Sequence, residues 1–116
     1  MQFDSTRPIW LQVMRELEIS IVTGERGPGE KLPGGRDLAL AYSINPNTAV
    51  RVYQELERAG LCETRRGLGT FVTSDTQRIT ALRSEFAHQT VHDFLQQLQR
   101  LGVTREQAAQ MILKEE

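Results

Sequence analysis

The chain has 116 residues, of which 39% are hydrophobic and 25% charged, and this is the size and composition of one ordinary globular domain. No apolar stretch approaches the length of a transmembrane helix, and the first eight residues lack the basic start and apolar run of a secretory signal. The single cysteine, Cys62, excludes an internal disulfide framework and a zinc site built from cysteines. We therefore expect a cytoplasmic chain with no membrane partner and no cofactor.

The charges are unevenly distributed along the chain. The net charge of −1 argues against a general polyanion-binding protein. Residues 31–73 nevertheless carry six basic and four acidic side chains, and they form the only third of the chain with a positive balance. Twelve of the fourteen basic residues are arginine, which contacts phosphate or guanine with two donors at once. A search for function therefore begins in residues 31–73.

An amphipathic helix is predicted from about Pro8 to Thr23. Its apolar residues recur every fourth position, at Ile9, Val13, Leu17 and Ile21. Thr6 or Ser5 is expected to cap this helix, and Gly24 is expected to end it. The aromatic residues Trp10 and Tyr42 are interpreted as core side chains rather than as a ligand cage.

Residues 24–33 are dense in glycine and proline and are predicted to form a loop. The loop is not a phosphate-binding P-loop, because Gly29 is followed by Glu30 rather than by lysine and a hydroxyl residue. A helix also precedes it, where a P-loop follows a strand.

Two further helices are predicted on either side of a short break. The first covers Gly35–Tyr42, and the residues from Ser43 interrupt the chain. Asn45 is suited to the N-cap of the second helix and Pro46 to its first turn, and Gly60 ends it after about Ala59. A helical wheel places one group of side chains inward: Ala49, Val52, Tyr53 and Leu56. The opposite face carries Asn47, Arg51, Gln54 and Arg58.

A β-hairpin is predicted next. Residues 61–64 and 70–73 are rich in strand formers, and they flank the basic, glycine-containing segment Arg65-Arg-Gly-Leu-Gly69. A helix-turn-helix followed at once by such a hairpin is typical of a winged helix-turn-helix, which offers a helix to the major groove and a ribbon to the neighbouring groove or backbone. Cys62, at the start of the first strand, is interpreted as a packing residue. The fold class is therefore mainly α (α+β), with residues 1–74 as a winged helix-turn-helix DNA-binding domain.

Residues 75–116 are predicted to form a helical hairpin. A long amphipathic helix runs from Thr76 to Leu101, and the capping-box pattern from Thr104 to Gln107 opens a short last helix. Two helices with little else to cover them suggest a dimerisation tail that packs on a second copy of the chain. The apolar residues expected at this interface are Ile79, Leu82, Phe86, Val91, Phe94, Leu95, Leu98, Leu101, Met111 and Ile112.

The motifs occur in a familiar order. The segments Pro28-Gly-Glu-Lys-Leu-Pro33, Arg36-Asp-Leu-Ala39, Ile44-Asn-Pro-Asn-Thr48 and Thr64-Arg-Arg-Gly-Leu-Gly-Thr-Phe-Val72 resemble the N-terminal winged-helix domain of the GntR family of bacterial transcription regulators. The resemblance covers residues 8–73. The Asn-Pro-Asn-Thr start of the third helix and the short helical tail are similar to the YtrA subfamily. One departure is Gly34 and Gly35, which stand where the family has a hydroxyl cap after Leu-Pro.

The resemblance implies a homodimeric repressor that binds an inverted-repeat operator in double-stranded DNA, for instance that of a transporter operon. Any small-molecule effector is unidentified. Carried over by position, the DNA-binding residues are Arg36, Asn45, Asn47, Thr48, Arg51, Arg65, Arg66, Gly67, Gly69 and Thr70.

Three other interpretations stay open or are set aside. A winged helix can serve protein contacts alone, with an incidental basic wing. An enzyme needs clustered acid–base or nucleophilic residues, and the sequence has no such pattern. Glu85, His88 and His92 have the helical spacing of metal ligands, but a polar helix face with two ordinary histidines is favoured, so His88 and His92 are weak candidates and no metal is expected.

Overall fold

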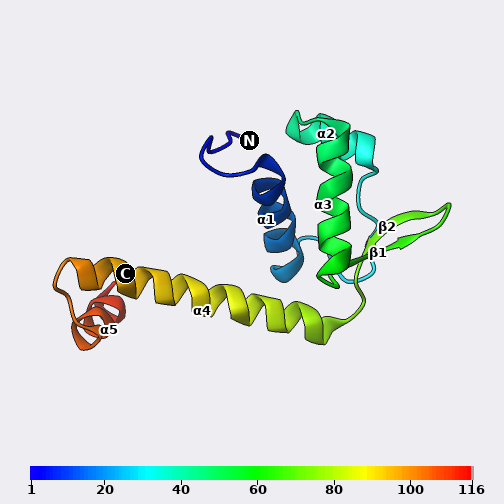
Figure 1. Ribbon diagram of the computed structural model, residues 1–116. Helices are drawn as coiled ribbons and strands as arrows, with labels where there is room; N and C mark the ends of the chain where they lie inside the picture. The colour runs from blue at the N-terminus through cyan, green and yellow to red at the C-terminus, as the bar shows by residue number, and fades with distance from the viewer. Residues whose placement is uncertain (116) are drawn as a thin grey trace. The chain divides into compact units, whose positions relative to one another are not determined.

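The computed structural model describes residues 1–115 and contains five helices and two strands in this part of the chain (Figure 1). In chain order they are α1 (Ile9–Val22), α2 (Gly35–Tyr42), α3 (Pro46–Arg58), β1 (Cys62–Arg65), β2 (Gly69–Val72), α4 (Thr76–Arg100) and α5 (Arg105–Lys114). The chain is therefore mainly helical with one two-stranded hairpin, as predicted. None of the helices in residues 1–115 combines the length and apolar character needed to cross a membrane.

Two compact units make up the chain. The first is Met1–Ala81 and the second begins at Leu82, so that the division falls inside α4. The first unit holds the three-helix and hairpin arrangement of a winged helix-turn-helix.

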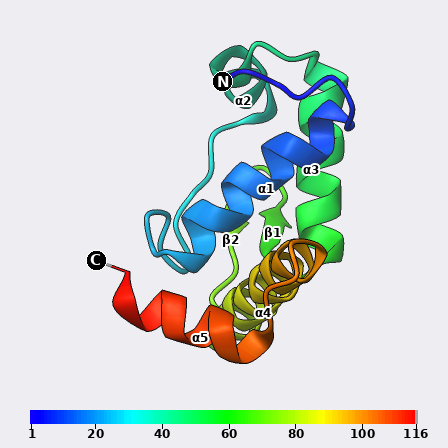
Figure 2. The same ribbon diagram turned by 90° about the vertical axis from the view of Figure 1, so that its left-hand side faces the viewer.

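The core of the first unit is formed where α1 and α2 pack against α3. Figures 1 and 2 show α1 lying alongside α3. The inward residues are fully or almost fully buried, and they are Val13, Leu17, Ile21, Leu38, Ala49, Val52, Tyr53 and Leu56. The helical spacing in the sequence therefore identifies most of the inner residues, but Ile9, the first of the apolar series in α1, is 45% exposed. The Tyr53 hydroxyl also donates a hydrogen bond to the Pro33 carbonyl, which ties α3 to the segment that leads into α2.

The start of α3 is built as predicted and the start of α1 is not. The Asn45 side chain accepts a hydrogen bond of 2.8 Å from the Asn47 backbone N–H, with Pro46 in the first turn. At α1 the N-cap is Pro8, without a side-chain cap. The prediction that Thr6 or Ser5 caps α1 is wrong, because the Thr6 hydroxyl donates to the Asp4 carboxylate at 2.6 Å instead.

The hairpin has a third backbone partner. Strands β1 and β2 pair antiparallel, with Cys62 opposite Val72 and Arg65 opposite Gly69. Lys31 forms a bridge with Phe71, and the Leu32 N–H donates to the Thr70 carbonyl at 2.8 Å. The end of the glycine-rich segment, predicted as a loop, thus lies along the free edge of β2. The sequence does not signal this pairing, because its backbone partner lies far along the chain.

The second unit consists of the rest of α4 and α5. The predicted capping box is present: the Thr104 hydroxyl accepts from the Gln107 N–H at 3.1 Å, and the Gln107 side chain accepts from the Thr104 N–H at 2.9 Å. Large apolar side chains stay exposed on both helices and directly after α4, namely Val91, Phe94, Leu101, Met111, Ile112 and Leu113. Half-buried positions in α4 include Ile79, Phe86, Leu95 and Leu98. Leu82 is buried, so it is packed within the chain and offers no surface to a second copy.

Candidate nucleic-acid interface

The first turns of α3 carry a polar, exposed surface. Asn47 and Arg51 are exposed and, being four residues apart, lie on the same side of the helix. Thr48, next to Asn47, is half-buried. The Asn45 side chain is occupied by its cap to Asn47. The backbone N–H groups of a helix start also face outward and favour an anion. This end of α3 can therefore present amide, hydroxyl and guanidinium groups to a duplex.

Two α3 residues outside the expected set share this surface. Val50 is 49% exposed, and Gln54 lies about two turns after Asn47 and is also exposed. An exposed apolar side chain can contact the methyl group of thymine, and a glutamine amide can form hydrogen bonds with adenine. The signal for Gln54 was the helical wheel, whereas Val50 had none because its residue type suggests burial. Farther along, Arg58 is paired with Glu55 at 3.4 Å.

Arg51 is held by an aromatic ring from another helix. Its guanidinium carbon lies 4.2 Å from the centroid of the Trp10 ring, in the first turn of α1. Trp10 is half-buried, so the interpretation of this residue as a core side chain holds only for part of the ring. Tyr42 is half-buried as well, and burial raises the pKa of its phenol.

Arg36 lies in the first turn of α2 and is exposed. Gly34 is the N-cap of this helix and provides no side chain for a capping hydrogen bond. The N-terminus of α2 thus has a cation beside free backbone donors, which is an arrangement that attracts phosphate.

The wing tip is formed by Arg66, Gly67 and Leu68. The Leu68 N–H donates to the Arg65 carbonyl at 2.9 Å, and Gly67 has a φ of +78°, which closes the turn in a conformation that favours glycine. Arg66 is exposed and, within residues 1–115, makes no hydrogen bond or ion pair. Leu68 is 62% exposed. The tip therefore projects one available cation.

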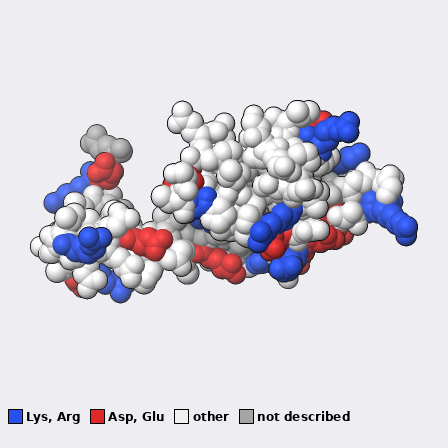
Figure 3. Space-filling model, turned by 45° about the horizontal axis from the view of Figure 1, so that its top comes forward, with Lys and Arg blue, Asp and Glu red and all other residues white. Residues whose placement is uncertain are grey.

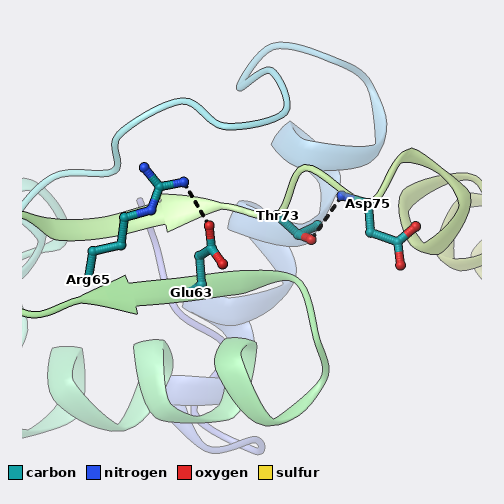
Figure 4. Close-up of polar contacts among 4 residues, drawn as sticks. All are labelled: Glu63, Arg65, Thr73 and Asp75. Carbon is teal, nitrogen blue, oxygen red and sulfur yellow. Dashed lines mark hydrogen bonds and ion pairs between the residues drawn. The ribbon is translucent and has the colours of Figure 1, made fainter.

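Arg65 is at the end of β1 and is turned back along the hairpin. Its guanidinium donates to the Glu63 carboxylate at 2.8 Å (Figure 4). It also lies 4.4 Å from the centroid of the Phe71 ring. The two arginines of the wing are therefore different: Arg65 is engaged on the hairpin surface, while Arg66 is available.

The other expected wing residues lie at the base of the tip. Thr70 is half-buried, and Gly69 has a φ of +123°. A Cβ at Gly69 would approach the Lys31 side chain to 2.9 Å, so Lys31 lies directly across this glycine. Lys31 is a third exposed cation of the wing, which sequence reasoning missed because the residue belongs to a separate segment. Figure 3 shows basic side chains gathered at the projecting end of the hairpin.

The remaining titratable candidates do not form a site. Cys62 is buried, and burial raises the pKa of its thiol to about 12, which is the state of an unreactive packing residue. Within residues 1–115 no three histidine, cysteine or acidic side chains are arranged to hold a metal ion, so Glu85, His88 and His92 are not brought together as ligands.

A groove of about 640 Å³ is present in the second unit, between the last turns of α4 and the start of α5. It is lined by His92, Leu95, Gln96, Gln99, Gly102, Val103, Thr104 and Arg105.

The fold and the exposed polar surfaces of α3 and the wing define a winged helix-turn-helix protein of the DNA-binding class. Residues 10–72 match the family described as bacterial regulatory proteins, gntR family, and the chain belongs to this family of transcription regulators, which are not enzymes.

Two curated relatives resemble the chain. It is 39% identical over 106 residues to the uncharacterized HTH-type transcriptional regulator YhcF of Bacillus subtilis, covering 91% of this chain and 88% of that protein. It is 40% identical over 73 residues to the HTH-type transcriptional repressor YtrA of the same organism, covering 63% of this chain and 56% of that protein. The resemblance to the YtrA subfamily is confirmed.

Solved structures support the same assignment. A GntR family transcriptional regulator from Listeria monocytogenes has a TM-score of 0.91 at 35% identity, covering 98% of this chain and all of that chain. The DNA-binding domain of AraR, solved in complex with operator ORX1, has a TM-score of 0.57 at 26% identity over 63% of this chain and 89% of that chain. The first similarity extends through the tail. The second shows that a homologous winged helix-turn-helix domain, which corresponds to residues 1–74 of this chain and is called the head below, binds an operator.

Proposed function

We propose that this chain is a homodimeric repressor that binds an inverted-repeat operator in double-stranded DNA. Residues 1–74 read the DNA, and residues 75–116 join two copies. The observation that carries the proposal is the pair of available arginines, Arg51 on α3 and Arg66 at the wing tip, beside the polar start of α3. Such a regulator acts in the cytoplasm, where bacterial DNA lies.

Each half of the operator would be read by one copy. The start of α3 enters the major groove, where Asn47, Thr48 and Arg51 face base edges or phosphates, and Arg36 contacts the backbone. Arg66 and the glycines of the tip approach the neighbouring groove. Two-fold symmetry places the half-sites about one helical turn, ~10 bp, or a multiple of it apart.

The repressor role is supported by the name of the relative YtrA. The exposed apolar residues of α4 and α5 support the joining role, because a monomer would leave this surface in water. Regulation in this arrangement acts on the spacing of the two heads.

DNA fragments recovered by the purified protein from its source genome test the proposal. Fluorescence anisotropy at two salt concentrations would give the affinity for the recovered duplexes and its salt slope. We expect nanomolar binding, with Arg51→Ala and Arg66→Ala each weakening it, and a loss of about 0.9 log unit of affinity per log unit of salt for each phosphate contact.

Arg105→Ala is the matched control, because it removes the same charge from an exposed position of the tail. It is expected to leave DNA binding unchanged. If the protein recovers no fragments and binds DNA without salt dependence, and if both head variants behave as the wild type, the basic wing is incidental and a protein-binding role replaces the proposal.

A further inference from the structure

We propose that Trp10 is a positioning residue for DNA reading: its indole ring holds the Arg51 guanidinium in the orientation from which Arg51 donates hydrogen bonds to DNA. The inference rests on the proposed function and deepens it. It assigns a specificity role to α1, which lies outside both the helix-turn-helix pair α2–α3 and the wing β1–β2.

The contact is fixed by the core of the first unit. Trp10 is the second residue of α1, and Arg51 is in the second turn of α3. The two helices pack against each other, and Val13 of α1 and Val52 of α3 are fully buried in the core. Because the ring is half-buried, its position is determined by this packing, and the guanidinium rests on the ring at 4.2 Å.

The geometry suits the chemistry of arginine. A guanidinium is planar, its face stacks on an aromatic ring, and its five N–H donors point outward in the plane. Stacking therefore uses the face and leaves the donors available. Within residues 1–115 no acceptor takes a hydrogen bond from Arg51, and no carboxylate pairs with it. The side chain is ordered before it meets DNA, so less rotamer entropy is lost on binding.

The wing provides an internal contrast. Arg65 also stacks on a ring, that of Phe71, but its donor is already taken by Glu63 at 2.8 Å. Part of the donor set of Arg65 is therefore used within the hairpin. Arg51 combines stacking with free donors on an exposed surface, which is the arrangement needed for bidentate contact with guanine or a phosphate.

The experiment begins with an operator selected by the wild-type protein from a random duplex library. Affinities for every single-base-pair variant of that duplex are then measured for the wild type, Trp10→Phe, Trp10→Leu and Arg51→Ala. Arg51→Ala marks the base pairs that Arg51 reads. We expect Trp10→Leu to reduce discrimination at those base pairs alone, about three- to fivefold, which is the size of an exposed cation–π contact. Trp10→Phe retains an aromatic face, so its discrimination is expected to lie between that of the wild type and that of Trp10→Leu.

A double variant separates positioning from packing. In the Arg51→Ala background, Trp10→Leu should add no further loss of discrimination, because the residue that it positions is absent. Leu11→Ala is the matched control, since Leu11 is 43% exposed in the same turn of α1 and is expected to leave discrimination intact. Thermal unfolding of each variant confirms that the heads are folded.

The contact is also visible without DNA. Trp10 is the only tryptophan of the chain, so its emission reports on this ring alone. Arg51→Ala replaces the guanidinium by water and should shift the emission to longer wavelength. An unchanged spectrum contradicts the contact in solution.

The outcomes distinguish the two proposals. If Trp10→Leu weakens binding equally for every base-pair variant, or if it retains full discrimination, Trp10 does not position Arg51. The proposed function is unaffected by either result. Failure of the wild-type protein to select any duplex overturns the proposed function, and the inference falls with it.

Discussion

The Glu63 carboxylate accepts a hydrogen bond of 2.8 Å from the Arg65 guanidinium two residues later on the same strand (Figure 4). Both side chains are about half exposed, at 53% and 47%, so the pair contributes little to stability. It does place a negative charge on the wing, next to the cation that the family resemblance assigns to DNA. Glu63 therefore lowers the positive potential of the wing.

Glu63→Gln is expected to tighten DNA binding severalfold at low salt and to steepen the salt dependence, because Arg65 becomes available to a phosphate. The slope should rise by about 0.9 log unit per log unit of salt for each wing that gains a contact. Anisotropy titrations over a range of salt concentrations measure both quantities. Glu115→Gln removes the same charge from the end of the chain and serves as the control. Equal affinities for the wild type and Glu63→Gln would show that Arg65 takes no part in binding.

The N-terminus of α2 lacks a side-chain cap, and the backbone there accepts one. Gly34 has φ −61° and ψ 162°, the extended conformation of an N-cap, and an added Cβ would meet no atom within 4 Å. Gly34→Ser should therefore stabilise the head by about 0.5–1 kcal/mol, through the capping hydrogen bond and the reduced freedom of the unfolded chain.

Gly34→Ala separates these two contributions, because alanine restricts the unfolded chain but cannot cap. Urea unfolding should give the midpoint order Ser above Ala, with unchanged slopes. A serine variant no more stable than the alanine variant would mean that the hydroxyl does not reach the backbone N–H groups of α2.

Local sequence signals predicted the elements and their ends well, and contacts between distant segments escaped them. Asn45 and Pro46 start α3, and Thr104 starts α5, because capping depends on residues within one turn. The stacking of Arg51 on Trp10 and the bridge from Lys31 to Phe71 depend on how separate segments pack, which no local pattern encodes.

The candidate site shows the same division. The wheel placed Asn47 and Arg51 on the outer face of α3, and both are exposed there. The family resemblance assigned both arginines of the wing to DNA, but in the structure Arg65 pairs with Glu63 and Arg66 lies at the tip. Residue types identified the surface, and only the three-dimensional arrangement separates available cations from paired ones.

Buried ionisable groups predict a loss of stability at high pH. Burial raises the pKa of the Cys62 thiol from 9.0 to about 12 and that of the Tyr53 phenol from 10.0 to about 12. The folded state thus holds both protons more tightly than the unfolded state. Their contribution is present below pH 9 and is lost as the pH rises towards 12.

The free energy of unfolding should be level from pH 7 to about pH 8.5 and then fall. In Cys62→Ala the fall should begin about one pH unit later, because the phenols of Tyr53 and Tyr42 remain and the pKa of an unfolded tyrosine is higher than that of a cysteine. Denaturant titrations at fixed pH values measure the two profiles, and each is compared with its own value at pH 7. Superimposable profiles would mean that the Cys62 thiol has the same pKa in the folded and the unfolded state.

Dimerisation through the tail is the last prediction, and it depends on apolar side chains that the chain itself leaves uncovered. Leu101 is 76% exposed and Phe94 40%, so neither contributes much to the fold of a single copy. Sedimentation of the wild type at micromolar concentration should give twice the 13.2 kDa of one chain. The variant with Phe94→Asp and Leu101→Asp should sediment as a folded monomer, because burying two carboxylates in an apolar interface is costly.

Leu40→Asp is the control for a charge added at an exposed leucine, since Leu40 is 72% exposed on α2 of the head. It should leave the molecular mass at the dimer value. The double variant should retain the helical circular dichroism of the wild type and lose high affinity for an operator with two half-sites, because each head then binds alone and the second no longer benefits from effective concentration. A wild type that sediments at 13.2 kDa, or a double variant that still forms a dimer, would remove α4 and α5 from the assembly and require the two half-sites to be bridged by another surface.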